Sequence, residues 1–283
     1  MNYSDYCSPG TKIQTRYLEI SDDIQLFEVH FSPKDISKYP PVIFIPGWGS
    51  FIQGWKIVLQ EMSKDFEIYY IETREKGSAK HKREQKISIQ NIGDDIAKAV
   101  QLHDMDDNSF IALGSSMGAT VILDAMAENK LKPSLSVLIG PNIEFNIPQF
   151  LIIFIALMPN QLYKMIKPCL KWYMKRKYID MNSDSKQYHK YAYVLDHIHL
   201  GRTRRSALSF KKYSFENKID QIKSRILIFS GKKDILHSYE KTLSMANRVM
   251  NATLINLETN DRTHSVEMVD EMKAYLKKYN LFK

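Results

Sequence analysis

The sequence has few cysteines and no long apolar segment. Its 283 residues include two cysteines, Cys7 and Cys169. Two cysteines cannot form a disulfide framework and make no metal-ligand pattern, so we expect a reduced, cytoplasmic protein without a metal site. The longest apolar run, residues 150–158, is nine residues long and ends at Pro159. A membrane-spanning helix needs about 20 such residues, which excludes an integral membrane protein.

Acidic residues are scarce in one part of the chain. Residues 159–214 contain thirteen lysines and arginines against three aspartates, a net charge of +10, whereas the whole chain carries +8. The rest of the chain is therefore nearly neutral, unlike a uniformly basic nucleic-acid-binding protein, and the basic segment shows no recognised nucleic-acid motif. We predict no nucleic-acid partner, and expect any anionic partner to meet this segment.

Apolar runs with strand and helix periods alternate along most of the chain. Residues 24–31 alternate apolar and polar side chains, as in a half-buried antiparallel strand. The other predicted strands are 42–45, 66–71, 110–113, 135–139, 225–229 and 253–257, and the predicted helices are 55–62, 89–102, 117–126, 239–249 and 266–279. This order predicts an α/β fold with a mostly parallel central sheet and helices on both faces.

The alternation stops between residues 142 and 222, where the sequence is basic, aromatic and helix-like. It has too many apolar residues and too few glycines and serines for a flexible linker. We therefore predict a core of residues 1–141 and 223–283, with residues 142–222 forming a helical cap inserted after the strand 135–139.

A G-x-S-x-G pattern follows the predicted strand 110–113. It consists of Gly114, Ser115, Ser116, Met117 and Gly118 and opens the next helix. The glycines allow a sharp turn that lifts the Ser116 hydroxyl above the sheet, and the backbone N–H of Met117 lies at the helix N-terminus, suited to an oxyanion. The alternative is a glycine- and serine-rich turn without chemistry.

Three further residues follow the ends of predicted strands. Trp48, in the turn after strand 42–45, is a candidate second oxyanion donor through its backbone N–H. Asp234 and His264 follow the strands 225–229 and 253–257, and they supply the carboxylate and imidazole that activate a serine. Singly, these residues are also explained as a core tryptophan, a helix N-cap and a loop histidine.

These motifs resemble the α/β-hydrolase family over residues 40–140 and 223–280. The resemblance places the insert after the family's sixth strand, the usual position of a cap. The resemblance implies Ser116 as nucleophile, Asp234 as acid, His264 as base, Trp48 and Met117 as the oxyanion hole, and no cofactor. Residues 72–79 resemble the family's D-x-R-G-x-G-x-S loop but depart from it at Glu72, Glu75 and Ala79, which replace Asp, Gly and Ser. The serine nucleophile argues against the epoxide hydrolase and dehalogenase branches.

The cap is the part of the sequence that bears on the substrate. Its apolar run and its basic rim suit an ester with an acyl chain and a polar or anionic head, such as a monoacylglycerol or lysophospholipid. Residues 162–177 mix bulky apolar residues with lysines, which is typical of a helix touching anionic lipid and also of an ordinary cap helix. An acyltransferase, a small-peptide or amide hydrolase, and a non-catalytic binding protein remain as alternatives.

Overall fold

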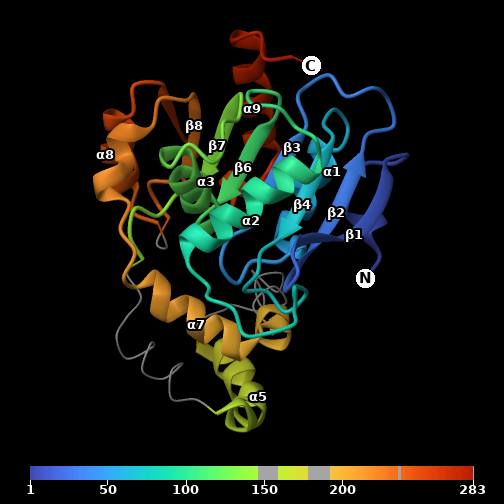
Figure 1. Ribbon diagram of the computed structural model, residues 1–283, viewed down its shortest axis with the longest axis vertical. Coiled ribbons are helices and arrows are strands. Elements are labelled where there is room, and N and C mark those ends of the chain that lie inside the picture. Colours follow the sequence, from blue (N-terminus) through green and yellow to red (C-terminus); the bar gives the residue numbers. More distant parts are fainter. Residues whose placement is uncertain (146–158, 178–191, 235–236, 283) are drawn as a thin grey trace.

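The computed structural model describes residues 1–145, 159–177, 192–234 and 237–282 (Figure 1). The apolar run at 150–158 lies outside the described residues. The strands are β1 (Lys12–Ser21), β2 (Ile24–Ser32), β3 (Val42–Ile45), β4 (Ile68–Glu72), β5 (Lys80–His81), β6 (Ile111–Ser115), β7 (Leu135–Ile139), β8 (Ile226–Ser230) and β9 (Ala252–Asn256). The α-helices are α1 (Lys56–Met62), α2 (Ile89–Leu102), α3 (Met117–Ala127), α5 (Asn160–Lys177), α7 (Leu200–Phe210), α8 (Tyr239–Arg248) and α9 (Val266–Lys278). Short 3-10 helices span Tyr3–Tyr6, Ile52–Trp55, Glu216–Gln221 and Arg262–His264.

All the strands belong to one mixed sheet. The order is β1-β2-β4-β3-β6-β7-β8-β9, with the short strand β5 paired to β2. Strand β2 pairs antiparallel with β1, β4 and β5, whereas the pairs from β4 through β3 to β9 are parallel. The carboxyl ends of the parallel strands meet at one edge, where ligands of open α/β sheets bind. The mostly parallel sheet predicted from the sequence is confirmed.

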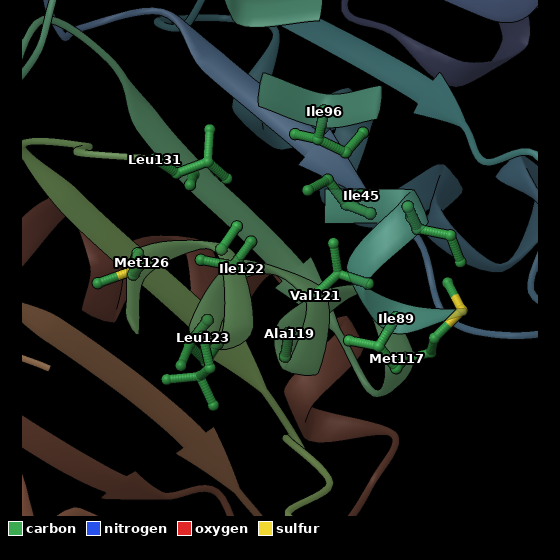
Figure 2. Close-up of a cluster of buried hydrophobic side chains, with 14 of the residues drawn as sticks. Ile45, Ile89, Ile96, Met117, Ala119, Val121, Ile122, Leu123, Met126 and Leu131 are labelled. Carbon is green, nitrogen blue, oxygen red and sulfur yellow. The ribbon is translucent and has the colours of Figure 1, made fainter. Parts of the chain in front are cut away.

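Helices cover both faces of the sheet. Strands β3, β6, β7 and β8 are completely buried, as their continuous apolar runs require. One hydrophobic cluster lies between the sheet and helices α2, α3 and α8, and Figure 2 shows part of it around Ile45, Ile96 and Val121. A second cluster, on the other face, packs residues of α1 and α9 against the sheet, including Leu59 and Met272.

Strand β1 was not expected from the sequence. It pairs with β2 over nearly its whole length, and Leu18 is its one buried residue. It forms the outer edge of the sheet, where polar side chains replace the apolar pattern that reveals an inner strand. Its stability comes from the antiparallel pairing with β2 rather than from a buried face of its own.

The chain leaves the sheet after β7 and returns to it at the adjacent strand β8. Strand β7 is the sixth strand when the two-residue strand β5 is set aside. Helices α5 and α7 lie between these points and gather at one end of the molecule (Figure 1). Within the described ranges, no helix has the length and apolar character that crossing a bilayer requires.

Candidate active site

Ser116 occupies a sharp, strained turn between β6 and α3. Its backbone angles are φ 50° and ψ −113°, in a region that residues with a side chain seldom adopt. Both flanking glycines are required sterically. A Cβ added at Gly118 would lie 2.1 Å from the carbonyl oxygen of Ile45, and one at Gly114 would lie 2.6 Å from the backbone of Gly118. The turn is therefore built to raise one serine hydroxyl above the strand ends.

The hydroxyl of Ser116 contacts two side chains that the sequence did not single out. Nε2 of His237 lies 3.1 Å from Ser116 Oγ, and Asn142 donates through Nδ2 to the same oxygen over 2.9 Å. Nδ1 of His237 lies 2.8 Å from Oδ2 of Asp234, whose side chain is 4% exposed. Protonation of Nδ1 toward the carboxylate leaves Nε2 as the acceptor for the Ser116 proton.

The predicted base, His264, lies in the short 3-10 helix Arg262–His264 and lines the same pocket as Ser116 and His237. Its Nδ1 is 2.9 Å from the carbonyl oxygen of Asn260, and its ring centroid is 4.3 Å from that of Trp55. The structure therefore brings Ser116 and Asp234 together through His237, with His264 nearby. The role assigned to His264 from the sequence stays a prediction.

His237 is held by its surroundings as well as by Asp234. The backbone N–H of His237 donates to Oδ1 of Asp234 over 3.3 Å, so one carboxylate contacts both its main chain and its ring. A Cβ at Gly140 would lie 3.0 Å from the imidazole, which shows that the ring packs directly against this glycine after β7. The position of the His237 ring therefore depends on glycine at residue 140.

The two predicted oxyanion donors border Ser116. Met117 begins α3 directly after Ser116. Gly47, which precedes Trp48, lies so close to Ser116 that a Cβ added at Gly47 would be 3.3 Å from Cβ of Ser116. The indole Nε1 of Trp48 donates to Oγ of Ser206 in α7 over 2.9 Å. These placements are compatible with backbone donors at Trp48 and Met117.

A pocket of about 510 Å³ surrounds Ser116, in the size range of small-molecule sites. Part of its wall is apolar, and residues within 142–222 contribute to it. The apolar lining residues are Trp48, Phe51, Phe145, Val194 and Ile198. Charged and polar groups, including Glu75, Lys76 and Thr203, line the rest. The pocket can hold an acyl group next to a polar reaction centre.

Two histidines of the insert, His197 and His199, have structural partners. Nδ1 of His197 lies 2.9 Å from the carbonyl oxygen of Tyr193, and His199 accepts from the backbone N–H of Arg202 as the N-cap of α7. Burial and the nearby Arg202 lower the pKa of His199. Across the part of the chain that the structure describes, no group of three metal-binding side chains gathers.

The fold and the serine at the strand ends define the class of α/β-hydrolases. The chain matches the family described as "Serine aminopeptidase, S33" over residues 41–262, most of its length, and it belongs to this family of α/β-hydrolases. Comparison with curated protein sequences finds no match.

Solved structures show the same fold at low sequence identity. A hydrolase from Pseudomonas aeruginosa PA01 aligns with a TM-score of 0.73 at 13% identity, covering 93% of this chain and 97% of that one. An enol-lactonase from Burkholderia xenovorans LB400 gives 0.72 at 13% identity, with coverage of 93% and 99%. The esterase EaEST from Exiguobacterium antarcticum gives 0.70 at 15% identity, with coverage of 94% and 99%. The chain is a hydrolase of the α/β-hydrolase class.

Proposed function

We propose that this hydrolase cleaves carboxylic esters with an apolar acyl chain, of the monoacylglycerol or lysophospholipid type, through a covalent acyl-enzyme. The observation that carries the proposal is the chain of contacts from Ser116 Oγ through His237 to Asp234. The partly apolar pocket around Ser116 supports an acyl substrate. Residues 142–222 act as the cap that completes this pocket.

In the proposed mechanism, His237 accepts the Ser116 proton while Oγ attacks the ester carbonyl carbon. The backbone N–H groups of Trp48 and Met117 stabilise the oxyanion, and Asp234 stabilises the imidazolium. The imidazolium then protonates the leaving alcohol. A water molecule, deprotonated by the same imidazole, attacks the acyl-enzyme, and collapse of the second intermediate returns the proton to Ser116. Asn142 orients the Ser116 hydroxyl through its 2.9 Å hydrogen bond.

Substitution of Ser116 tests the nucleophile and the substrate class together. We expect Ser116→Ala to abolish fluorophosphonate labelling and ester hydrolysis while the thermal unfolding midpoint stays near that of the wild type. On a series of esters, wild-type kcat/KM should rise with acyl length. Labelling of the wild type, together with a higher kcat/KM for short esters, would support a serine hydrolase and contradict the acyl-lipid substrate. A folded wild type that is never labelled would contradict the hydrolase proposal.

The family description favours a second candidate, the hydrolysis of aminoacyl amides. The carboxylate of Glu75 lines the pocket beside the ammonium of Lys76, and its Oε2, which has no hydrogen-bond partner in the residues that the structure describes, is an acceptor for a substrate amine. Amino-acid anilides belong in the same substrate series, and a higher kcat/KM for them than for every ester would replace the ester proposal. An acyltransferase would reveal itself in the same assay through new esters formed with added alcohols.

Two histidines, His237 and His264, are candidates for the general base. His237 contacts Ser116 in the structure, whereas His264 holds the position that the family resemblance assigns to the base. We expect His237→Asn to lower kcat by about a thousandfold or more, because the serine loses its proton acceptor, and His264→Asn to lower it far less. Steady-state kinetics of both variants, with circular dichroism as a folding control, measures the difference.

The reverse ranking of these two variants would assign the base to His264, with Asp234 still as the acid. Near-wild-type kcat in both variants would contradict a histidine base altogether. The two substitutions serve as controls for each other because both residues line the same pocket and both side chains become the same amide.

We also propose that the basic insert touches anionic lipid. Helix α5 exposes Leu162, Met165 and Trp172, at 41%, 75% and 60%, and their spacing places them on one helical face. Such a face, in a segment of net charge +10, supports a peripheral contact with acidic headgroups.

The free cysteines Cys7 and Cys169 support a cytoplasmic location.

A further inference from the structure

A buried lysine contacts the turn of residues 46–50, which carries the proposed oxyanion donor Trp48 and is called the oxyanion loop below. The side chain of Lys76 is 2% exposed and lines the pocket around Ser116. Its ammonium group donates to the carbonyl oxygen of Gly47 over 3.0 Å. The backbone N–H of Ser50 donates to the same oxygen over 3.1 Å and closes the turn. A cation this deeply buried needs a specific reason for its position.

The carbonyl of Gly47 and the N–H of Trp48 belong to one peptide group. A trans peptide is planar, so its C=O and N–H point in opposite directions. Because no cis peptide is present among the described residues, fixing the carbonyl of Gly47 also fixes the direction of the Trp48 N–H. A charged donor on the carbonyl oxygen further polarises the amide and makes its N–H a stronger donor.

Glu75 balances the charge of Lys76. Its Oε1 lies 3.4 Å from Nζ of Lys76 and accepts from the hydroxyl of Thr73 over 2.8 Å. Both side chains of the pair are nearly inaccessible to solvent. The ammonium is therefore held in place by a carboxylate on one side and the peptide carbonyl on the other. Glu75 is one of the positions at which the sequence departs from the family loop.

Helix α7 contacts both the segment that carries Lys76 and the side chain of Trp48. Arg202 donates through Nη1 to the carbonyl oxygens of Lys76 and Ala79, over 2.6 and 2.8 Å. One turn further along α7, Ser206 accepts from the indole of Trp48. Arg202 and Ser206, at positions i and i+4 of the same helix, thus hold the backbone around Lys76 and the oxyanion loop.

We propose that Lys76 is a positioning residue for the oxyanion hole, acting through the Gly47–Trp48 peptide, and that α7 maintains this contact. The inference rests on the proposed serine hydrolase mechanism, in which the Trp48 N–H binds the oxyanion. Lys76 touches the peptide rather than the substrate, so it acts on the transition state through the donor it orients.

The test replaces Lys76 with an uncharged residue of similar length. We expect Lys76→Met to lower kcat about ten- to a hundredfold with little change in KM, because the oxyanion forms only in the transition state. The rate constant of fluorophosphonate inactivation should fall by a similar factor. Lys76→Arg keeps a cationic donor and should recover part of the loss. Lys80→Met, in the short strand β5 just after Lys76, changes an exposed lysine and is the matched control that should retain wild-type kcat.

Removing Lys76 alone leaves Glu75 buried without its cation, which can prevent folding. The double variant Glu75→Gln with Lys76→Met removes both charges and carries the test in that case, with the same expected loss of kcat. A folded variant lacking the ammonium but retaining wild-type kcat would overturn the proposal.

A second readout separates this proposal from the hydrolase mechanism itself. The backbone amide proton of Trp48 should shift in the NMR spectrum when Lys76 is replaced by Met, and should not shift in Lys80→Met. This signal requires no turnover. An unlabelled wild type would contradict the serine hydrolase alone, whereas an unchanged Trp48 amide signal would contradict the role of Lys76.

Discussion

At the scale of single residues, steric repulsion fixes the turn that carries Ser116. Gly118 faces the backbone of Ile45 and Pro46, and a methyl group there would meet three backbone atoms at 2.9 Å or less. Strand β3 cannot move away because it is hydrogen-bonded to neighbours on both sides. The glycine is therefore required by packing, independently of any chemistry at Ser116.

We expect Gly118→Ala to lower the free energy of unfolding by about 3 kcal/mol, the upper end of the usual cost of overpacking. Urea denaturation measures this loss. Gly201→Ala in α7 is the matched control, since its Cβ would meet only His199 at 3.6 Å and a helical alanine is favourable. Equal stability of the two variants would show that the turn relaxes around the added methyl group.

The sequence predicts some residues of the site better than others. Ser116 is marked by its two glycines, and Asp234 by the end of a strand. Asn142 follows the end of β7 in the same way, so the strand-end criterion could have identified it. His237 carries no such signal, because its place depends on its contacts with Asp234 and Gly140. Contacts of this kind are set by tertiary packing and have no sequence period.

At the scale of elements, the predictability of a strand follows its burial. Strands β3 and β7 begin and end where the sequence predicts, because both are buried along their whole length and break at proline, glycine or polar residues. The edge strand β1 was missed because it has one buried residue. Helix α2, with its apolar face on the sheet and Ser88 as N-cap, also matches its predicted bounds.

At the scale of the whole molecule, charge and exposed apolar surface coincide on the insert. The basic segment 159–214 contains α5 and α7, which lie together at one end of the molecule (Figure 1). Lys167 and Lys171 of α5 are paired with Asp196, so their charge is partly balanced within the insert. Attraction to a lipid surface then depends on the remaining cations and on the apolar face of α5.

We therefore expect the protein to cosediment with vesicles containing phosphatidylglycerol and much less with vesicles of phosphatidylcholine alone, and we expect added salt to weaken the binding. Met165→Ser with Trp172→Ser should lower the partition coefficient about tenfold or more, since inserting each side chain contributes on the order of 1.5 kcal/mol. Met250→Ser removes an apolar side chain that is 92% exposed but lies outside the insert, and it should leave binding unchanged. Equal losses in the two variants would indicate nonspecific adsorption. Wild-type binding by the α5 variant would instead mean that the apolar face of α5 does not insert and that the vesicles bind through charge or through another part of the surface.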